Sequence, residues 1–323
     1  MKRFSTILLC LTLVLGTVFV LAGCGEPKNP TTADNNGTTV ICTNFAALDF
    51  TRSMLTHYTE NGGTGEVQLV MLGKPGQDMH SFEPTAQDII SLANADIVIC
   101  TGAEGWLDAA LSASGNTVAR KVSMMEACDA EHAEHGHDHD HDHGDEDCAI
   151  VDNDEHVWLS VDYATRITLA IADALKEADG ENAAAWEACA GIATAELSDL
   201  KNEFHDMMTY AVRDTVVIAD RHPFVYLFEE LGLNCVAAFP GCSSETSASF
   251  ETQMKLIESV NSLDLPYIFI MEGSDGKVAE VVARETGAEI LTLNSMQVMT
   301  DFDEATYTDI MRANLENLKK ALQ

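Results

Sequence analysis

Histidines and acidic residues gather in one stretch near the middle of the chain, and these side chains are well suited to holding a metal ion. Histidine alternates with aspartate from His137 to His143, and the stretch from Glu131 to Asp147 around this run is rich in histidine and acidic residues. The histidines of this tract are His132, His135, His137, His139, His141 and His143. Imidazole and carboxylate groups bind borderline divalent cations such as zinc. The sequence therefore predicts an accessory metal-collecting loop at residues 131–147.

A different kind of histidine follows the tract. His156 lies in the segment DEHVWLS, which runs from Asp154 to Ser160. Its bulky apolar neighbours can fix the orientation of the imidazole ring, which a metal ligand requires and a loose tract lacks. Taken alone, His156 could equally be a buried core histidine with no function. Its place in the fold relative to the other histidines must decide between a core residue and a metal ligand.

Short apolar segments alternate with helical patterns along most of the chain. In the first half the strand candidates are Val40–Thr43, Val67–Leu72, Asp96–Thr101 and Val118–Val122. In the second half they are Thr215–Asp220, Cys235–Phe239, Tyr267–Met271 and Glu289–Leu293. This alternation predicts an α/β fold with two lobes, each a mostly parallel sheet with flanking helices.

One long helical pattern separates the two halves. It begins near Asn182, and its apolar residues recur at steps of three and four, at Trp186, Cys189, Ala193, Leu197, Leu200, Phe204, Met207 and Ala211. Such a stripe indicates one buried helix face. About 30 residues at 1.5 Å each span roughly 45 Å. We expect one long rigid helix that bridges the lobes, with a metal cleft between them.

Two histidines, His80 and His222, come just after predicted strands, whereas His57 and His205 fall within predicted helices. Open α/β sheets bind ligands at the carboxyl ends of their strands. A cleft between two lobes would bring both histidines together with His156. Three imidazoles and a water or a carboxylate suit tetrahedral zinc. We therefore expect His80, His156 and His222 to be the metal ligands.

The first residues have the features of a targeting segment. Lys2 and Arg3 precede an apolar run that is short for a membrane-spanning helix. The run closes with LAGC, which ends at Cys24 and resembles the bacterial lipobox. This resemblance implies a signal peptide at residues 1–23 and lipid attachment at Cys24, where two or more acyl chains give stable anchoring. The polar stretch that follows predicts a flexible tether at residues 24–38.

The same patterns set the remaining boundaries. We expect an N-terminal α/β lobe at residues 39–159, linking helices that include the long helix at 160–212, and a C-terminal α/β lobe at 213–323. Cys128 and Cys148 bracket the histidine tract. They either close it as a loop through a disulfide or are buried, unpaired thiols, and the sequence leaves both open. The sequence contains no CxxC pair, which argues against a thiolate zinc site.

The composition limits the partners of the chain. Its 323 residues carry a formal net charge of -34 at pH 7, and 46% of them are hydrophobic. The apolar content is enough for real cores, and the length favours two lobes. The charge repels nucleic acid, so we expect no nucleic-acid partner, and it raises the local concentration of cations.

Three motifs resemble those of a known family, the substrate-binding lipoproteins of zinc and manganese ABC importers. They are PGQDMHSFEP at Pro75–Pro84, DEHVWLS at Asp154–Ser160 and DRHPFVY at Asp220–Tyr226, and the likeness extends from about Val40 to Leu322. Each resembles one ligand loop of the family. An acidic, histidine-rich loop before the second motif is typical of the zinc branch.

This resemblance implies a function and a location. The chain is expected to bind zinc, with manganese as the second choice, and to deliver the ion to an ABC permease driven by a cytoplasmic ATPase. It is expected to be a monomer without enzymatic activity. Its expected place is the extracytoplasmic face of a bacterial membrane, where the lipid anchor holds it.

The last ligand loop departs from the family pattern. The family often supplies a carboxylate or a histidine there, whereas this chain has Asn294 within the segment LNSMQ. Because an asparagine is a poor zinc ligand, the fourth position could be filled by water or by the carboxylate of Glu272 or Glu245. The sequence also leaves Asn294 itself open as the fourth ligand.

Two alternatives belong to other functional classes. A secreted zinc hydrolase would use the same ions, but the sequence has no HExxH motif, and a hydrolase needs a general base beside its bound water. A metal-buffering surface adhesin would share the fold. Loss of zinc-limited growth on deletion, without turnover by the pure protein, separates import from both.

Overall fold

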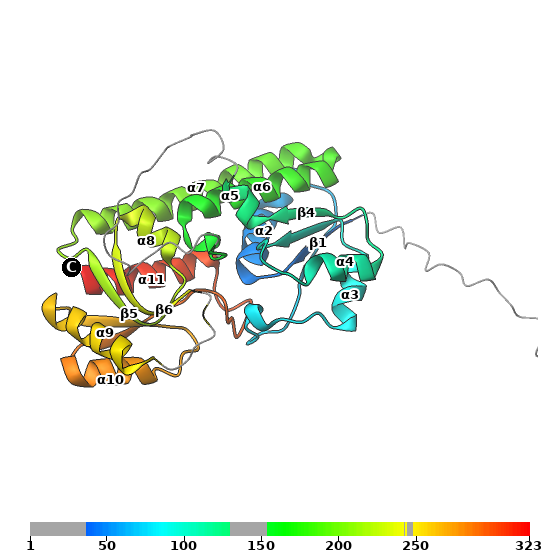
Figure 1. Ribbon diagram of the computed structural model, residues 1–323. Coiled ribbons are helices and arrows are strands. Elements are labelled where there is room, and N and C mark those ends of the chain that lie inside the picture. The colour runs from blue at the N-terminus through cyan, green and yellow to red at the C-terminus, as the bar shows by residue number, and fades with distance from the viewer. Residues whose placement is uncertain (1–36, 130–153, 242, 244–247) are drawn as a thin grey trace, which may run out of the picture. The chain divides into compact units, whose positions relative to one another are not determined.

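A computed structural model describes residues 37–129, 154–241, 243 and 248–323 (Figure 1). These residues belong to one compact unit. The lipobox cysteine, the tether up to residue 36, the histidine tract and Glu245 lie outside the described residues. Among the helices that are described, none is both long and apolar enough to cross a membrane.

Two four-stranded parallel sheets form the framework, and both have the same strand order relative to their own first strand. The first sheet has the order β2-β1-β3-β4, with β1 (Thr38–Cys42), β2 (Val67–Met71), β3 (Ile97–Cys100) and β4 (Arg120–Ser123). The second has the order β6-β5-β7-β8, with β5 (Thr215–His222), β6 (Asn234–Pro240), β7 (Tyr267–Met271) and β8 (Glu289–Leu293). All paired strands are parallel, so their carboxyl ends lie at one edge of each sheet.

The central strands are apolar on both faces because helices cover both faces. In β1, Val40 packs toward the large core, whereas its neighbour Ile41 packs toward a second cluster on the opposite face. One face of the first sheet is covered by α3 (Ala86–Ala93) and α4 (Leu107–Ser114). The matching face of the second sheet is covered by α9 (Phe250–Ser262) and α10 (Lys277–Thr286). Each sheet is therefore the middle layer of an α/β/α sandwich.

The inner faces of both sheets share one continuous core. Its helices are α2 (Phe45–Tyr58), α5 (Met124–Asp129), α6 (Val161–Ala178), α7 (Ala183–Thr209), α8 (Val225–Leu231) and α11 (Tyr307–Leu322). Ile99 of the first sheet and Ile218 of the second belong to the same cluster of buried residues. Because one core serves both sheets, the two halves are held as a single unit.

The longest helix, α7, runs beside α6 and contacts elements of both halves (Figure 1). Its 27 residues span about 40 Å at 1.5 Å per residue. The predicted apolar stripe is its buried face, except that Ala211 lies beyond the helix end. The predicted fold class, two parallel α/β lobes bridged by one long helix, is confirmed.

Several boundaries differ from those expected, among them the start of β1 at Thr38, inside the expected tether, and the position of β4, which begins at Arg120 and not at Val118. Strand β5 continues to His222, two residues past the predicted end, so His222 is the last residue of a strand and not part of the following loop. The polar pair Asp220 and Arg221 interrupts the apolar run, and the pairing of β5 with β6 shifts register there. The short helix α5 follows β4 directly and was not predicted.

The described cysteines are deeply buried, and several are poor metal ligands. Cys42, Cys100 and Cys189 are unpaired. Burial raises the pKa of Cys42 and of Cys100 to about 12, so neither forms a thiolate at neutral pH. Cys128 is also buried, but Cys148 lies outside the described residues, and the pairing of these two stays a prediction.

Candidate metal centre

His80 is held by the aspartate two residues before it. It lies in the single-turn helix η1 (Met79–Ser81), in the loop after β2. The Asp78 carboxylate accepts the backbone N–H of His80 at 2.9 Å and contacts the ring Nδ1 at 2.8 Å. This bond to the imidazole lowers the pKa of Asp78 to about 2, so the carboxylate is ionised. An imidazole whose Nδ1–H is donated to a carboxylate is the usual arrangement of histidines that bind a metal through Nε2.

His156 has the same arrangement in a buried setting. Asp154 Oδ1 accepts the backbone N–H of His156 at 2.9 Å and contacts its Nδ1 at 2.7 Å. His156 is fully buried, and its ring lies 5.3 Å from that of Trp158. Both histidines thus end an Asp-x-His motif whose aspartate sets the ring orientation. The apolar surroundings expected from the sequence are present.

The structure brings His80 and His156 together and adds Glu155 to them. The two imidazole centroids are 5.5 Å apart. Glu155 Oε1 lies 3.1 Å from His80 Nε2. In the described part of the chain, these three residues form the one group of three or more potential ligands, with ligand atoms that all lie within 4.8 Å of one another. Two imidazoles and a carboxylate are an ordinary donor set for zinc.

His222 lies close to this group without belonging to it. It ends β5, is 7% exposed, and its ring packs 4.9 Å from that of Phe228. Its Nδ1 is buried and has no hydrogen-bond partner among the described residues. Burial lowers the pKa of His222 to about 4, with a smaller opposing effect of the Asp154 charge and a smaller effect of His156 in the same direction. The ring is therefore neutral at pH 7.

The third Asp-x-His motif differs from the first two. Asp220 stands two residues before His222, but its Oδ1 accepts the N–H of Arg221 at 2.8 Å and its Oδ2 that of Met271 at 3.3 Å. Asp220 therefore holds β5 against β7. It does not meet the Nδ1 of His222, which stays a buried polar atom without a hydrogen-bond partner among the described residues. Such atoms are rare in proteins, and an ion or a water usually satisfies them.

A glycine lets the two halves of this site approach. A Cβ at Gly241 would lie 2.8 Å from Asp154 Oδ2 and 2.9 Å from the carbonyl oxygen of His222. Any other residue there would push apart the aspartate that orients His156 and the strand that carries His222. Tyr226 also donates its hydroxyl to the carbonyl of Asp154 at 2.8 Å.

The last loop reaches the same place. The half-buried Glu272 accepts the Ser295 N–H at 2.8 Å, the Ser295 hydroxyl at 2.7 Å and the Gln297 N–H at 3.0 Å. Burial raises the pKa of Glu272. The loop it fixes places the side-chain amide of Gln297 in hydrogen-bond contact with His156 Nε2.

Two of the expected fourth ligands are engaged in shaping that loop. Glu272 is hydrogen-bonded through both oxygens, and Asn294 Oδ1 accepts the N–H of Met296 at 2.8 Å. Sequence reasoning missed Glu155 and Gln297 as neighbours of the site. The sequence did contain a signal for Glu155, because this acid stands between Asp154 and His156. It contained no signal for Gln297, because the hydrogen bond between its N–H and Glu272 helps to position this residue, and a contact between such distant residues has no local pattern.

Further contacts fix the segment around His156. Trp158 donates its indole N–H to the carbonyl of Ser295 at 3.0 Å and accepts the Tyr307 hydroxyl on its own carbonyl at 2.8 Å. The Ser160 hydroxyl accepts the N–H of Tyr163 at 3.2 Å and so begins α6. Arg221 Nη1 lies 3.7 Å from Asp78 Oδ2, and this ion pair joins the two halves. Together these contacts fix the segments that carry the candidate ligands.

Other polar features lie elsewhere. His57 of α2 is 3.6 Å from Glu60. His205 is an exposed residue of α7. A cavity of about 450 Å³ between α2, α7 and the start of α11 is lined by other residues, among them Asp49 and Arg52.

Comparisons with known proteins find similar chains among zinc-uptake and zinc-binding proteins. The family model of the periplasmic zinc-uptake complex component A matches residues 50–321. The chain is 27% identical over 323 residues to the high-affinity zinc uptake system protein ZnuA of Bacillus subtilis (strain 168), with 96% of each sequence covered. It is 25% identical over 296 residues to the zinc-binding protein AdcA of Streptococcus pyogenes, covering 87% of this chain and 55% of AdcA. The chain thus spans about half the length of that relative.

Solved structures give the same fold. The metal-dependent lipoprotein YcdH of Bacillus subtilis superposes with a TM-score of 0.69 at 25% identity, covering 88% of this chain and 99% of YcdH. The Zn(II)-bound ZnuA-like domain of Streptococcus pneumoniae AdcA has a TM-score of 0.67 at 22% identity, with 88% and 99% covered.

Proposed function

The chain belongs to the family of the zinc-uptake complex component A, and we propose that it holds its zinc ion through His80, His156 and His222. Proteins of this family bind a substrate for transport, so the hydrolase alternative is not supported. The chain is accordingly a zinc-binding, substrate-binding protein of an ABC importer. The residues that bind the ion are our inference from the geometry.

The buried ring of His222 is the observation that carries the proposal. A neutral imidazole with an unpartnered nitrogen, close to the carboxylate of Asp154 and the ring of His156, loses hydrogen bonding unless something else binds there. A zinc ion satisfies this need. It would also join His222, from the second sheet, to the two histidines whose aspartates already orient them.

The site suits capture and release without catalysis. Asp78 and Asp154 orient their imidazoles and strengthen them as donors, which is the usual supporting arrangement at zinc sites. Deprotonated imidazoles bind borderline zinc better than the harder manganese, so we propose zinc as the preferred cargo. A permease and its cytoplasmic ATPase would then accept the ion.

Attachment through Cys24 is proposed from the LAGC segment, and it has a direct test. Cys24→Ser should leave the protein without lipid, because the thiol is the attachment atom. The variant is expected in the soluble fraction and the parent in the membrane fraction, with mass spectrometry showing the acyl groups on the parent alone. Retention of the variant in the membrane with its fatty acids would contradict lipid anchoring. Cys42→Ser, which changes a buried thiol, is the matched control.

Deletion of residues 131–147 tests whether the histidine tract and the proposed tight zinc site are independent of each other. We expect calorimetry on the deletion protein to show loss of several weak zinc sites and retention of one tight site. A tract must be ordered at an entropy cost when it binds, whereas the orienting hydrogen bonds of His80 and His156 already exist. Loss of the tight site would mean that the tract itself is the principal site.

A further inference from the structure

A carboxylate stands beside the histidines at a position within the DEHVWLS motif that the sequence did not mark as a ligand. We propose that Glu155 is a ligand of the transported zinc ion and that it forms, with His80 and His156, a three-ligand set on the first half of the molecule. This inference rests on the proposed function and deepens it, because it identifies a ligand beyond the three histidines.

The geometry of Glu155 favours a ligand role. Its Oε1 is 3.1 Å from His80 Nε2, which is the metal-binding nitrogen of a ring whose Nδ1 is committed to Asp78. The ligand atoms of Glu155, His80 and His156 lie within 4.8 Å of one another. Its side chain is 21% exposed, so the carboxylate stands at the solvent side of the fully buried His156. An arriving cation would thus meet Glu155 and His80 before His156.

The other acids of the site are less suited to this role. Asp78 and Asp154 each use an oxygen to orient a histidine. Both oxygens of Glu272 accept hydrogen bonds from the last loop. A carboxylate from Glu155 therefore supplies an anionic donor that this loop, with Asn294 and Gln297, does not provide.

All three residues of the set come from the first half of the molecule. His80 follows β2 of the first sheet, and Glu155 and His156 precede the single-turn helix η2 (Val157–Leu159) that leads into α6. None of the three comes from the second sheet. His222 would add a donor from the second sheet to this set.

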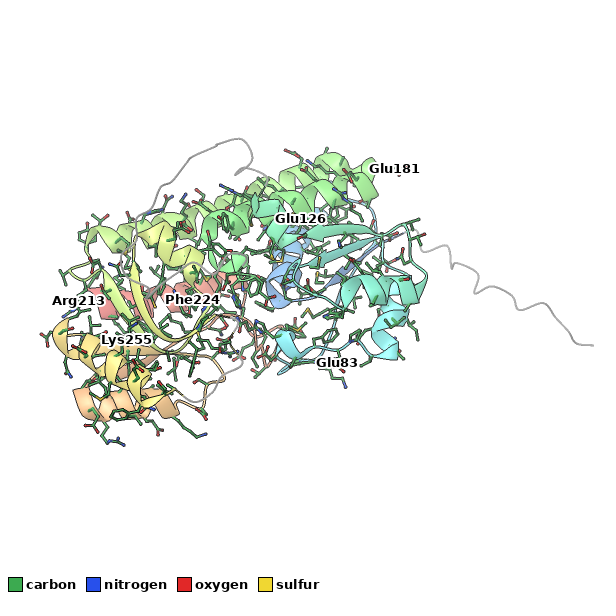
Figure 2. The ribbon with its side chains drawn as sticks, viewed as in Figure 1. Glu83, Glu126, Glu181, Arg213, Phe224 and Lys255 are labelled. Carbon is green, nitrogen blue, oxygen red and sulfur yellow. The ribbon has the colours of Figure 1, made fainter. Side chains whose placement is uncertain are left out.

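The experiment uses the protein that lacks residues 131–147 and compares it with Glu155→Gln and Glu155→Ala versions. Glu126→Gln is the charge-matched control, because Glu126 is an exposed acid of α5 in the same half of the molecule (Figure 2). Zinc affinity is measured by competition with chromophoric chelators. The visible spectrum of the Co²⁺-loaded protein reports the ligand set, and thermal unfolding without metal checks the fold.

Both Glu155 variants are expected to bind zinc more than about 100-fold more weakly, since loss of a direct ligand exceeds the 10- to 100-fold effect of a supporting residue. Their Co²⁺ bands should change, and Glu126→Gln should match the parent. In a His222→Ala background, Glu155→Gln should remove the residual binding.

Unchanged affinity in the Glu155 variants, beside a parent that binds tightly, would overturn the inference and leave the proposed function intact. Weaker binding with an unchanged Co²⁺ spectrum would also overturn it, because it would make Glu155 a positioning residue for His80. A parent without any tight site would overturn both the inference and the proposed function.

Discussion

His80→Ala, His156→Ala and His222→Ala are each expected to weaken zinc binding by more than about 100-fold in the protein that lacks residues 131–147. Each change removes one nitrogen donor, and His156 in addition is fully buried, so water replaces its ring poorly. Competition titration with a chelator of known zinc affinity measures the effect. The deletion is needed because the tract would mask the loss by binding zinc itself.

The controls are the two histidines in helices. His57→Ala and His205→Ala should bind zinc like the parent, because His57 of α2 pairs with Glu60 and His205 is an exposed residue of α7. A His222→Ala protein that binds as tightly as the parent would remove this residue from the site. Equal losses in all five variants would mean that the measurement follows stability and not coordination.

The metal-free protein is expected to lose about 3 kcal/mol of stability through His222 as the pH falls from 6.5 toward 4. Burial lowers the pKa of His222 in the folded state to about 4, whereas the ordinary value is 6.5. Between these values the unfolded chain binds the proton and the folded chain does not. The contribution is therefore complete above pH 6.5 and is lost as the solution becomes more acidic, at about 1.4 kcal/mol per pKa unit.

Urea unfolding at several pH values, with a chelator present, measures this dependence. His222→Gln should show a shallower loss of unfolding free energy between pH 6.5 and pH 4, whatever its stability at pH 7. The control is His205→Gln, which changes an exposed histidine of α7. If His222→Gln and the parent lose the same free energy over this range, the ring of His222 is not held neutral by burial.

Much of the fold was readable from the sequence because its central strands are apolar on both faces. The bounds of β7 and β8 agree with the predicted segments, since both are short apolar runs set off by turns. The stripe of α7 was equally clear, because a buried helix face repeats every three to four residues. The end of β5 was missed because the polar residues Arg221 and His222 continue the strand beyond its apolar run.

The site was only partly readable. Strand ends and apolar neighbours indicated His80, His156 and His222, but their mutual placement depends on contacts between distant segments. Gly241 allows Asp154 to approach the strand end, and Glu272 aims the last loop. No local pattern encodes such contacts. The tract, Cys24 and Glu245 lie outside the described residues, so the expectations for them stay predictions.

Anomalous diffraction at the zinc edge, from crystals of the zinc-loaded protein without residues 131–147, tests the central claim most directly. The expected result is one strong peak about 2.0 to 2.1 Å from a ring nitrogen of each of His80, His156 and His222. A principal peak bound by other residues, with the ring of His222 still unpartnered, would contradict the account.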